Sequence, residues 1–276
     1  MVTGRVGFRT MHFAQGRDYN FSMIQIIFLF VWTGFSHPES AVETDEGIYI
    51  SDVGEFSMKD GVIWKVSGNS KVVVVRNLTD PKGLAVARGK IYVADIDRIW
   101  RIEKGGAVSL VVGPNSFPEA PRFLNGMAAD ATGYLYVSDT FGGWVYRLST
   151  LGKVERLFKV DKPNGLAVAS DGTVYTITFT NPGRIYAYKD GKAELVFSSE
   201  DIGGGDGLCL DEERGILYAS GYNSGKIIRI NLMTARSEVI AEGLTTPADI
   251  NLSASGSKLL VPLLEAGEVV EINLGY

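Results

Sequence analysis

Pro163-Asn164-Gly165-Leu166-Ala167-Val168 (PNGLAV) is the clearest copy of a short phrase that returns six times along the chain. In most copies a side chain able to bind a metal stands before a small residue and an apolar one. A period of about 40 to 45 residues is typical of β-propeller blades, each made of four short strands. The recurring position is 39 to 43 residues from one copy to the next and is occupied by Glu39, Lys82, Asn125, Asn164, Asp206 and Ala248.

The second repeat shows the strand content expected of one blade. Apolar and β-branched runs at 84–86, 90–94, 98–102 and 107–112 are separated by short segments with turn chemistry. No long stretch has the 3.6-residue period of an amphipathic helix, and the 33 glycines fall mostly at strand junctions. The sequence therefore predicts an all-β fold, a six-bladed β-propeller of four-stranded blades.

The sixth repeat is one strand short. It supplies runs at 249–252, 258–263 and 268–273, whereas the apolar run 24–32 (IQIIFLFVW) precedes the first repeat and belongs to none. Closing the ring of blades removes exposed sheet edges, so we expect run 24–32 to be the outer strand of the last blade. Residues 23–276 are then a single domain, and residues 1–22 form an N-terminal extension of uncertain role.

The same apolar run also has features of a secretory signal peptide, because Arg5, Arg9 and Arg17 precede it. Cleavage between Thr33 and Ser36 would remove the strand that completes the ring. This favours the strand interpretation and, with it, a cytoplasmic location; a signal at 23–32 would instead make the protein secreted or periplasmic. The run is too short for a transmembrane helix, so no stable membrane insertion is expected.

Composition excludes several classes of function. The net charge of −5 and a pI near 5.2 argue against a nucleic-acid partner, which would need a basic patch. The single cysteine, Cys209, cannot form an internal disulfide and is expected to be a small buried hydrophobe. With only His12 and His37 available, a histidine-rich zinc site is not expected, and a serine triad would have to use His37, which we expect to shape a loop. We expect a monomer.

The recurring position carries the chemistry. In a propeller the first strand of each blade lines the central channel, so side chains at its entrance converge on the axis. Mixed carboxylate and amide oxygens are typical of calcium sites, although zinc, magnesium or manganese is an alternative. For any single residue, binding of channel water or backbone groups is the favoured interpretation, but four such residues at the same phase of the repeat favour a metal site. The oxygen ligands at this position are Glu39, Asn125, Asn164 and Asp206.

Five other charged residues bear on this prediction. Lys82 occupies the same position and would repel a cation unless it points outward or binds the substrate. Asp249 is one step out of register and is expected to face the blade or to support a ligand. Asp52, Asp95 and Asp139, each at the end of a second strand, are expected to cap the turn that follows through bonds to the backbone.

These segments resemble a known family. Glu39 in HPESAV, Asn125 in RFLNGMAAD, Asn164 in KPNGLAVASDG and Asp206 in GGDGLCLDEERG are similar to the site of the regucalcin (senescence marker protein) and gluconolactonase family, six-bladed propellers related to paraoxonase. The resemblance implies that Glu39, Asn164 and Asp206 are metal ligands, that Asn125 is a ligand or a substrate contact, and that Asp206 is the catalytic acid or base.

The resemblance also implies that Arg122 binds the substrate, with Lys82 as a second candidate for an anionic group. Here Arg122 stands three residues before Asn125 where two are expected, and Gly126 follows where the family usually has Asp. We therefore predict a calcium-dependent, or other divalent-metal-dependent, hydrolase of lactones or related esters. Two alternatives remain: a non-catalytic propeller of the NHL-repeat type that binds a protein or small ligand, and a metal-free enzyme similar to strictosidine synthase.

Overall fold

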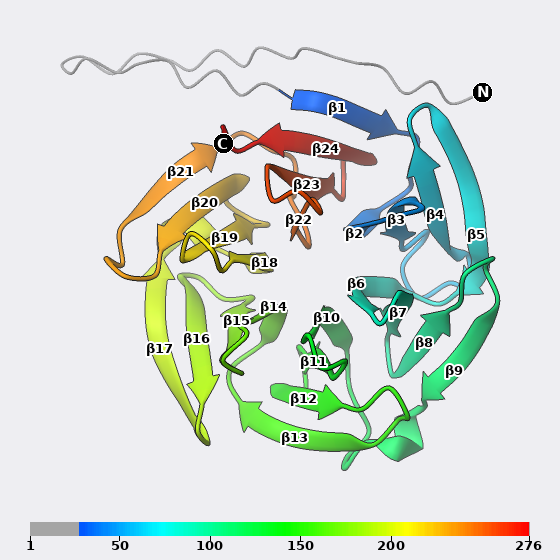
Figure 1. Cartoon of the computed structure of the whole chain (residues 1–276), viewed down its shortest axis with the longest axis horizontal. Helices are drawn as coiled ribbons and strands as arrows, with labels where there is room; N and C mark the ends of the chain where they lie inside the picture. Colours follow the sequence, from blue (N-terminus) through cyan, green and yellow to red (C-terminus); the bar gives the residue numbers. More distant parts are fainter. Residues whose placement is uncertain (1–27, 276) are drawn as a thin grey trace.

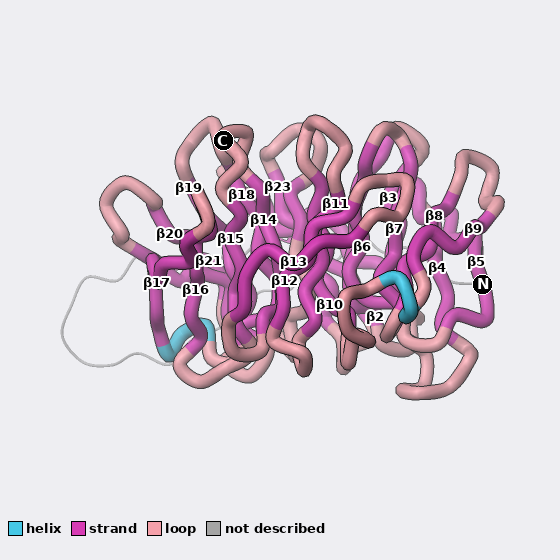
Figure 2. The backbone as a smooth tube through the Cα atoms, turned by 90° about the horizontal axis from the view of Figure 1, so that it is seen from below, coloured by secondary structure: helices cyan, strands magenta, loops and turns pink. Residues whose placement is uncertain are grey.

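Six antiparallel sheets of four strands each surround a central axis over residues 28–275, the part of the chain that the structure, a computed structural model, describes (Figure 1). Seen from the side, the strands span the thickness of a disc and the loops gather on its two faces (Figure 2). Helix is limited to two short 3-10 segments, η1 (Pro114–Ser116) and η2 (Glu200–Ile202), within these residues. The predicted six-bladed β-propeller is confirmed.

The blades follow the repeats, and within each blade the strands pair in chain order. The first three blades are β2 (Pro38–Thr44), β3 (Gly47–Asp52), β4 (Gly61–Ser67) and β5 (Ser70–Leu78); β6 (Pro81–Ala87), β7 (Lys90–Asp95), β8 (Arg98–Ile102) and β9 (Val108–Val112); and β10 (Leu124–Ala129), β11 (Leu135–Asp139), β12 (Trp144–Leu148) and β13 (Val154–Lys159). The next two are β14 (Pro163–Val168), β15 (Val174–Thr178), β16 (Gly183–Lys189) and β17 (Lys192–Ser199); and β18 (Gly205–Asp211), β19 (Ile216–Gly221), β20 (Lys226–Asn231) and β21 (Ser237–Ala241).

The sixth blade joins the two ends of the described chain, as expected. Its strands are β22 (Asn251–Leu252), β23 (Lys258–Leu263), β24 (Glu268–Asn273) and, as the outer strand, β1 (Phe28–Thr33). β1 pairs antiparallel with β24, with Trp32 opposite Val269. The predicted strand began at residue 24, and residues 24–27 lie outside the described part. In that part no helix has the length and apolar character needed to cross a membrane.

The closing strand is also tied to the first blade. The Trp32 indole donates a hydrogen bond to the Gly68 carbonyl at 3.3 Å. The Lys71 ammonium donates to the carbonyls of Thr33 and Gly34 at 3.3 and 2.6 Å. The Lys71 bonds satisfy carbonyls at the end of β1, and the Trp32 bond satisfies one in the first blade, so the last blade is held against its neighbour as well as within its own sheet.

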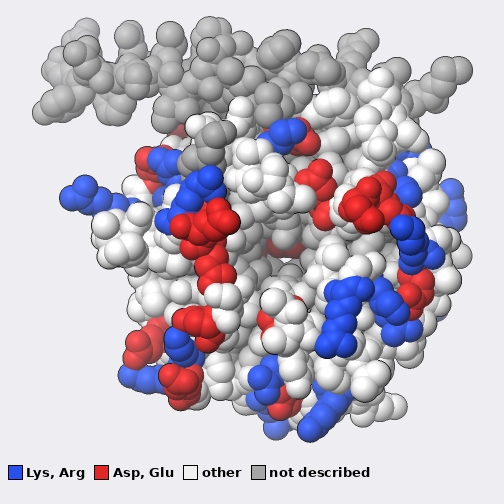
Figure 3. All heavy atoms as spheres, in the orientation of Figure 1, with Lys and Arg blue, Asp and Glu red and all other residues white. Residues whose placement is uncertain are grey.

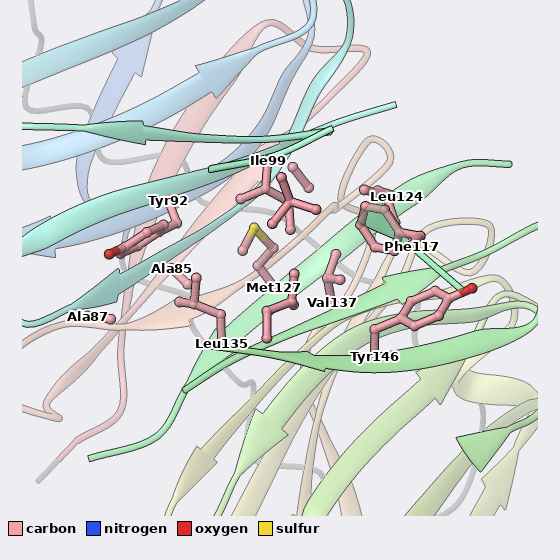
Figure 4. Close-up of a cluster of buried hydrophobic side chains, with 13 residues drawn as sticks. Ala85, Ala87, Tyr92, Ile99, Phe117, Leu124, Met127, Leu135, Val137 and Tyr146 are labelled. Carbon is pink, nitrogen blue, oxygen red and sulfur yellow. The ribbon is translucent and has the colours of Figure 1, made fainter. Parts of the chain in front are cut away.

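Apolar side chains fill the space between neighbouring blades. Figure 4 shows one such cluster, where Tyr92 from β7 lies with Met127 and Leu135 from the third blade. Phe117, in the loop after η1, packs edge-on against the Tyr146 ring at 5.2 Å. The wedge between two sheets thus acts as the hydrophobic core, and each blade depends on both neighbours for burial. On the face shown in Figure 3 the centre is hollowed, and side chains of both charge signs are interspersed around it.

Glycine follows the recurring position in four blades because the inner strands pass very close to one another. A Cβ on Gly165 would lie 2.4 Å from the Asp206 carbonyl oxygen, and one on Gly126 would lie 2.5 Å from the Asn164 carbonyl oxygen. For Gly83 and Gly207 the nearest backbone atoms of the next blade would be 2.6 and 2.3 Å away. Each contact is with backbone, so no side chain could move aside to make room.

Removal of the closing strand should destabilise the ring. A chain consisting of residues 28–276 should fold as the full chain does, whereas residues 34–276 leave β24 as an exposed edge and lose the bonds to the first blade. We expect aggregation or a large fall in melting temperature for the shorter chain, measured by calorimetry and light scattering. Equal solubility and stability of the two chains would contradict the role of β1 as the closing strand.

Gly165→Ala should test the close approach of the inner strands. The added methyl group overlaps with backbone of the fifth blade, so the free energy of unfolding should fall by about 1–3 kcal/mol or more, measured by urea titration. The matched control is Gly113→Ala, because Gly113 has extended backbone and a Cβ there would meet only the Leu110 side chain at 3.7 Å. Equal stability of the two variants would contradict the steric argument.

Candidate functional site

The first strands bring the polar members of the recurring position together in the interior. Their residues are only 2 to 6% exposed: Glu39, Lys82, Asn125, Asn164 and Asp206. Each lies at the second residue of β2, β6, β10, β14 or β18, at the same end of the first strand in five blades. Ala248, the sixth member, is fully buried and adds no polar atom.

Three buried aspartates position the chain that leads into these strands. Asp52 accepts hydrogen bonds from the backbone of Ser36 and His37, and Asp139 accepts them from Arg122 and Phe123. Asp95 accepts equivalent bonds from Thr79 and Asp80 in the second blade. The expected bonding to the backbone is therefore present, but its main target is the loop before the first strand. In the turn that follows, the Gly142 backbone N–H donates to Asp139, and the Gly54 backbone N–H donates a longer hydrogen bond to Asp52.

Lys82 points into the ring and pairs with Glu39. Its ammonium nitrogen lies 3.7 Å from Glu39 Oε2, and both side chains are at least 95% buried. The rings of Phe56 and Phe123 flank the ammonium at 4.9 and 5.4 Å from their centroids. Because 3.7 Å is longer than a hydrogen bond, the ammonium makes an ion pair and ring contacts, and it donates no hydrogen bond to any described residue.

Two oxygen atoms of the ring have no partner. Within residues 28–275, Asn125 Oδ1 and Asp206 Oδ1 are buried and accept no hydrogen bond. Burial raises the pKa of Asp206 well above its usual range; the charges of Glu39 and Asp249 raise it further, and Lys82 lowers it. Unpaired buried acceptors are costly, so two of them at the recurring position, one on a carboxyl group with a raised pKa, make the ring a candidate site for a ligand or a proton.

Asp249 supports the ring from the sixth blade. It occupies the position that is glycine in four other blades, and Ser40 occupies it in the first. The Ser40 hydroxyl donates to Asp249 Oδ2 at 2.6 Å, and the Asp249 backbone N–H donates to the Glu39 carbonyl at 2.9 Å. Burial raises the pKa of Asp249 to about 7, against the lowering effect of the Ser40 bond. The two hydrogen bonds agree with the expected supporting role of Asp249. The seam between the first and last blades thus carries a carboxyl group.

A hard divalent cation fits the oxygen set, although an ammonium shares the space. The two unpaired acceptors and the carboxylate of Glu39 are the oxygen types that calcium prefers. Among residues 28–275 no three His, Cys, Asp or Glu side chains are arranged to hold a metal, so the amides of Asn125 and Asn164 are needed to complete a set of ligands. Lys82 places a positive charge in the same ring and would compete with a cation for Glu39.

The remaining predicted residues lie elsewhere. Arg122 is exposed in the loop before β10, and only its backbone N–H is tied to the interior, through Asp139. His37 Nδ1 lies 2.7 Å from the Gly54 carbonyl, which agrees with a loop-shaping role. Cys209 is buried in an apolar cluster, and burial raises the pKa of its thiol well above the usual range. Sequence reasoning missed Phe56 and Phe123 beside Lys82, because loops of unequal length leave no periodic signal.

Comparison with known proteins places this chain in a family. Residues 43–259 match the family described as the SMP-30/Gluconolactonase/LRE-like region, so the chain belongs to that family. No curated protein sequence matches the chain. Among solved structures, a gluconolactonase from Xanthomonas campestris is 18% identical with a TM-score of 0.72, over 88% of this chain and 89% of that one.

Two further structures share the fold. A putative gluconolactonase is 20% identical with a TM-score of 0.72, over 87% of this chain and 89% of that one. Virginiamycin B lyase from Staphylococcus aureus is 14% identical with a TM-score of 0.65, over 88% of this chain and 98% of that one. At these identities the likeness shows the propeller, and the chemistry must be argued from the ring of buried polar groups.

Lys82→Met tests whether the Lys82 ammonium and a bound cation compete for Glu39. It leaves Glu39 buried without its partner, so the free energy of unfolding of the cation-free protein should fall by about 3–5 kcal/mol. Calcium should restore much of this loss, because Lys82 no longer competes for Glu39. Chemical denaturation with calcium or with chelator checks both effects, and the double variant Lys82→Met/Glu39→Gln is the control, close to wild type with chelator. A Lys82→Met variant as stable as wild type would contradict the pairing.

Proposed function

We propose that this protein hydrolyses lactones or related esters, and that its buried ring binds calcium or a similar divalent cation. The observation that carries the proposal is that two buried oxygen atoms at the recurring position, Asp206 Oδ1 and Asn125 Oδ1, have no hydrogen-bond partner within residues 28–275. Membership of the SMP-30/gluconolactonase family supports the reaction class. Glu39, Asn164 and Asp206 would hold the cation, with Asn125 as a further ligand or as a contact to the substrate.

Such a cation, when bound, supplies a Lewis acid that polarises a carbonyl oxygen. The chain itself supplies the means of moving protons. Hydrolysis adds the oxygen of water to the carbonyl carbon, breaks the bond from that carbon to the ring oxygen, and leaves a carboxylic acid and an alcohol. Asp206 takes the proton of the attacking water and returns it to the leaving ring oxygen, a role that suits a carboxyl group with a raised pKa.

Lys82 adds a fixed positive charge near the reacting carbonyl group. Its ammonium makes an ion pair with Glu39 and contacts two phenyl rings. Neither interaction is a hydrogen bond, so its three N–H groups are not used by hydrogen bonds within residues 28–275. A carbonyl oxygen that gains negative charge during the reaction, or the carboxylate that is formed, can accept from it. In a site that is shielded from water this interaction is stronger than it would be at the surface.

A second candidate function rests on the same lysine. Because Lys82 already neutralises one carboxylate of the ring, the site can also exist without a metal. A propeller of the NHL-repeat type that binds a small ligand, or a metal-free enzyme similar to strictosidine synthase, would use the ring in that state. Turnover of lactones separates the hydrolase from the binding protein, and the effect of a chelator separates it from the metal-free enzyme.

Asp206→Asn should abolish lactone hydrolysis. The amide can still coordinate a cation but cannot exchange a proton at neutral pH, so kcat should fall by about 10²- to 10⁴-fold even at saturating calcium. The control is Asp190→Asn, at an exposed residue in the hairpin between β16 and β17. The measurement is turnover of a panel of lactones and aryl esters; a variant as active as wild type on every substrate that is turned over would remove Asp206 from the mechanism.

The cation is tested separately by stability. Calcium at about a hundred times its Kd should add about 2.7 kcal/mol to the free energy of unfolding of the wild type. Glu39→Gln should lose most of this gain, because it removes one of the two charges that compensate the ion. A wild-type melting curve that is the same with calcium and with chelator would contradict cation binding and would favour the second candidate function.

A further inference from the structure

Aromatic side chains surround the buried ammonium on the side of the first three blades. We call His37, Phe56, Phe123 and Phe141 the aromatic arc. All four lie in loops at the end of the blades where the buried ring is: His37 and Phe123 precede β2 and β10, and Phe56 and Phe141 follow β3 and β11.

The members of the arc form two contacting pairs of rings. The His37 and Phe56 rings are 5.2 Å apart, and the Phe123 and Phe141 rings are 5.0 Å apart. The Lys82 ammonium lies between the two pairs, 4.9 Å from Phe56 and 5.4 Å from Phe123. The two pairs, one at the first blade and one at the third, are thus linked through the Lys82 ammonium between them.

The outer members of the arc are exposed. Phe56 is 48% and Phe141 is 54% exposed, whereas His37 and Phe123 are partly buried. Single exposed apolar residues are common, whereas apolar residues that gather at one place on the surface mark a site for a ligand or a partner. Here Phe56 and Phe141 link the apolar surface at the rim to the buried Lys82 ammonium, whose hydrogen-bond donors are unused.

The opposite side of the ring carries a second aromatic pair. Tyr222, after β19, lies 5.7 Å from Phe179, after β15, in an edge-on arrangement. Burial raises the pKa of Tyr222, and the charges of Glu265, Asp206 and Glu39 raise it further, so its hydroxyl lies within electrostatic reach of the buried ring. The buried ring is thus bordered by aromatic rings on two sides.

We propose that the aromatic arc is an apolar subsite, and that the enzyme selects lactones or esters with an alkyl or aryl substituent over polyhydroxylated sugar lactones. The inference deepens the proposed function and rests on it for the reaction, but not for the binding. The substituent lies on Phe56, Phe123 and Phe141, and the carbonyl oxygen accepts a hydrogen bond from Lys82.

The chemistry of the arc explains this preference. Burying an alkyl chain or a phenyl ring against three phenyl groups removes apolar surface from water on both partners. The hydroxyl groups of a sugar lactone would lose their bonds to water on the same surface, and phenyl rings offer no acceptor in return. The flanking rings also hold the ammonium in place, so the polar and apolar parts of the substrate are positioned together.

The test compares substrates of different polarity in the wild type and in Phe56→Ser/Phe141→Ser. For the wild type we expect kcat/KM for γ-decalactone, which carries a six-carbon chain, to exceed that for γ-butyrolactone and for glucono-δ-lactone by about tenfold or more. The double variant should lose this preference through a rise in KM that is about tenfold larger for γ-decalactone than for γ-butyrolactone, whereas the loss of the Phe56 ring beside Lys82 lowers the rate for both substrates alike. Both residues are exposed, so the variant should fold. The control is Tyr134→Ser, a 41% exposed aromatic residue beyond the other end of β10.

A binding measurement separates the subsite from the reaction. The lactam analogue of γ-decalactone, 5-hexylpyrrolidin-2-one, is not hydrolysed under these conditions and should bind to the wild type by calorimetry at least about tenfold more tightly than to the double variant. Such binding without turnover of any lactone would support the subsite and contradict the proposed function. Turnover with no preference for γ-decalactone, or with a preference that the double variant retains, would overturn the subsite and leave the proposed function standing.

Discussion

The close packing of the six inner strands around the axis is the constraint on which the rest of this structure depends. At Gly83, Gly126, Gly165 and Gly207 the backbone of one blade passes so near the next that a Cβ would lie within 2.6 Å of its backbone atoms. Glycine is required there for space, not for an unusual backbone angle. Because each of these glycines follows a residue of the recurring position, the packing that sets the blade spacing also brings those polar side chains together.

The seam between the first and last blades meets the same constraint with different chemistry. Ser40 and Asp249 stand where the other blades have glycine, and the bond between them joins β2 to the chain before β22. Asp206 is consequently within electrostatic reach of two other carboxyl groups, Glu39 and Asp249, and of the ammonium of Lys82. Burial is the main cause of the raised pKa values of both aspartates, and the neighbouring carboxyl groups raise them further. The proposed cation binding depends on this excess of acidic groups.

The agreement and the differences between sequence and structure have separate causes. The repeat predicted the blades and the closing strand, because strand pattern and turn chemistry are local properties. The same local logic assigned Asp52, Asp95 and Asp139 mainly to the following turn, whereas their main partners are backbone groups about sixteen residues earlier that the strand order brings back. Arg122 resembled a substrate contact by position along the chain, yet its side chain is exposed in the loop before β10.

The sequence by itself thus determined the fold class, the closure of the ring and the set of buried polar residues, since all of them follow from a period of about 42 residues. Only the tertiary structure decided how those residues relate to one another. Three features involve residues from different blades: the ion pair of Lys82 with Glu39, the unpaired oxygens of Asn125 and Asp206, and the aromatic arc. Loops of unequal length and contacts across the axis set these relations, and neither leaves a pattern along the chain.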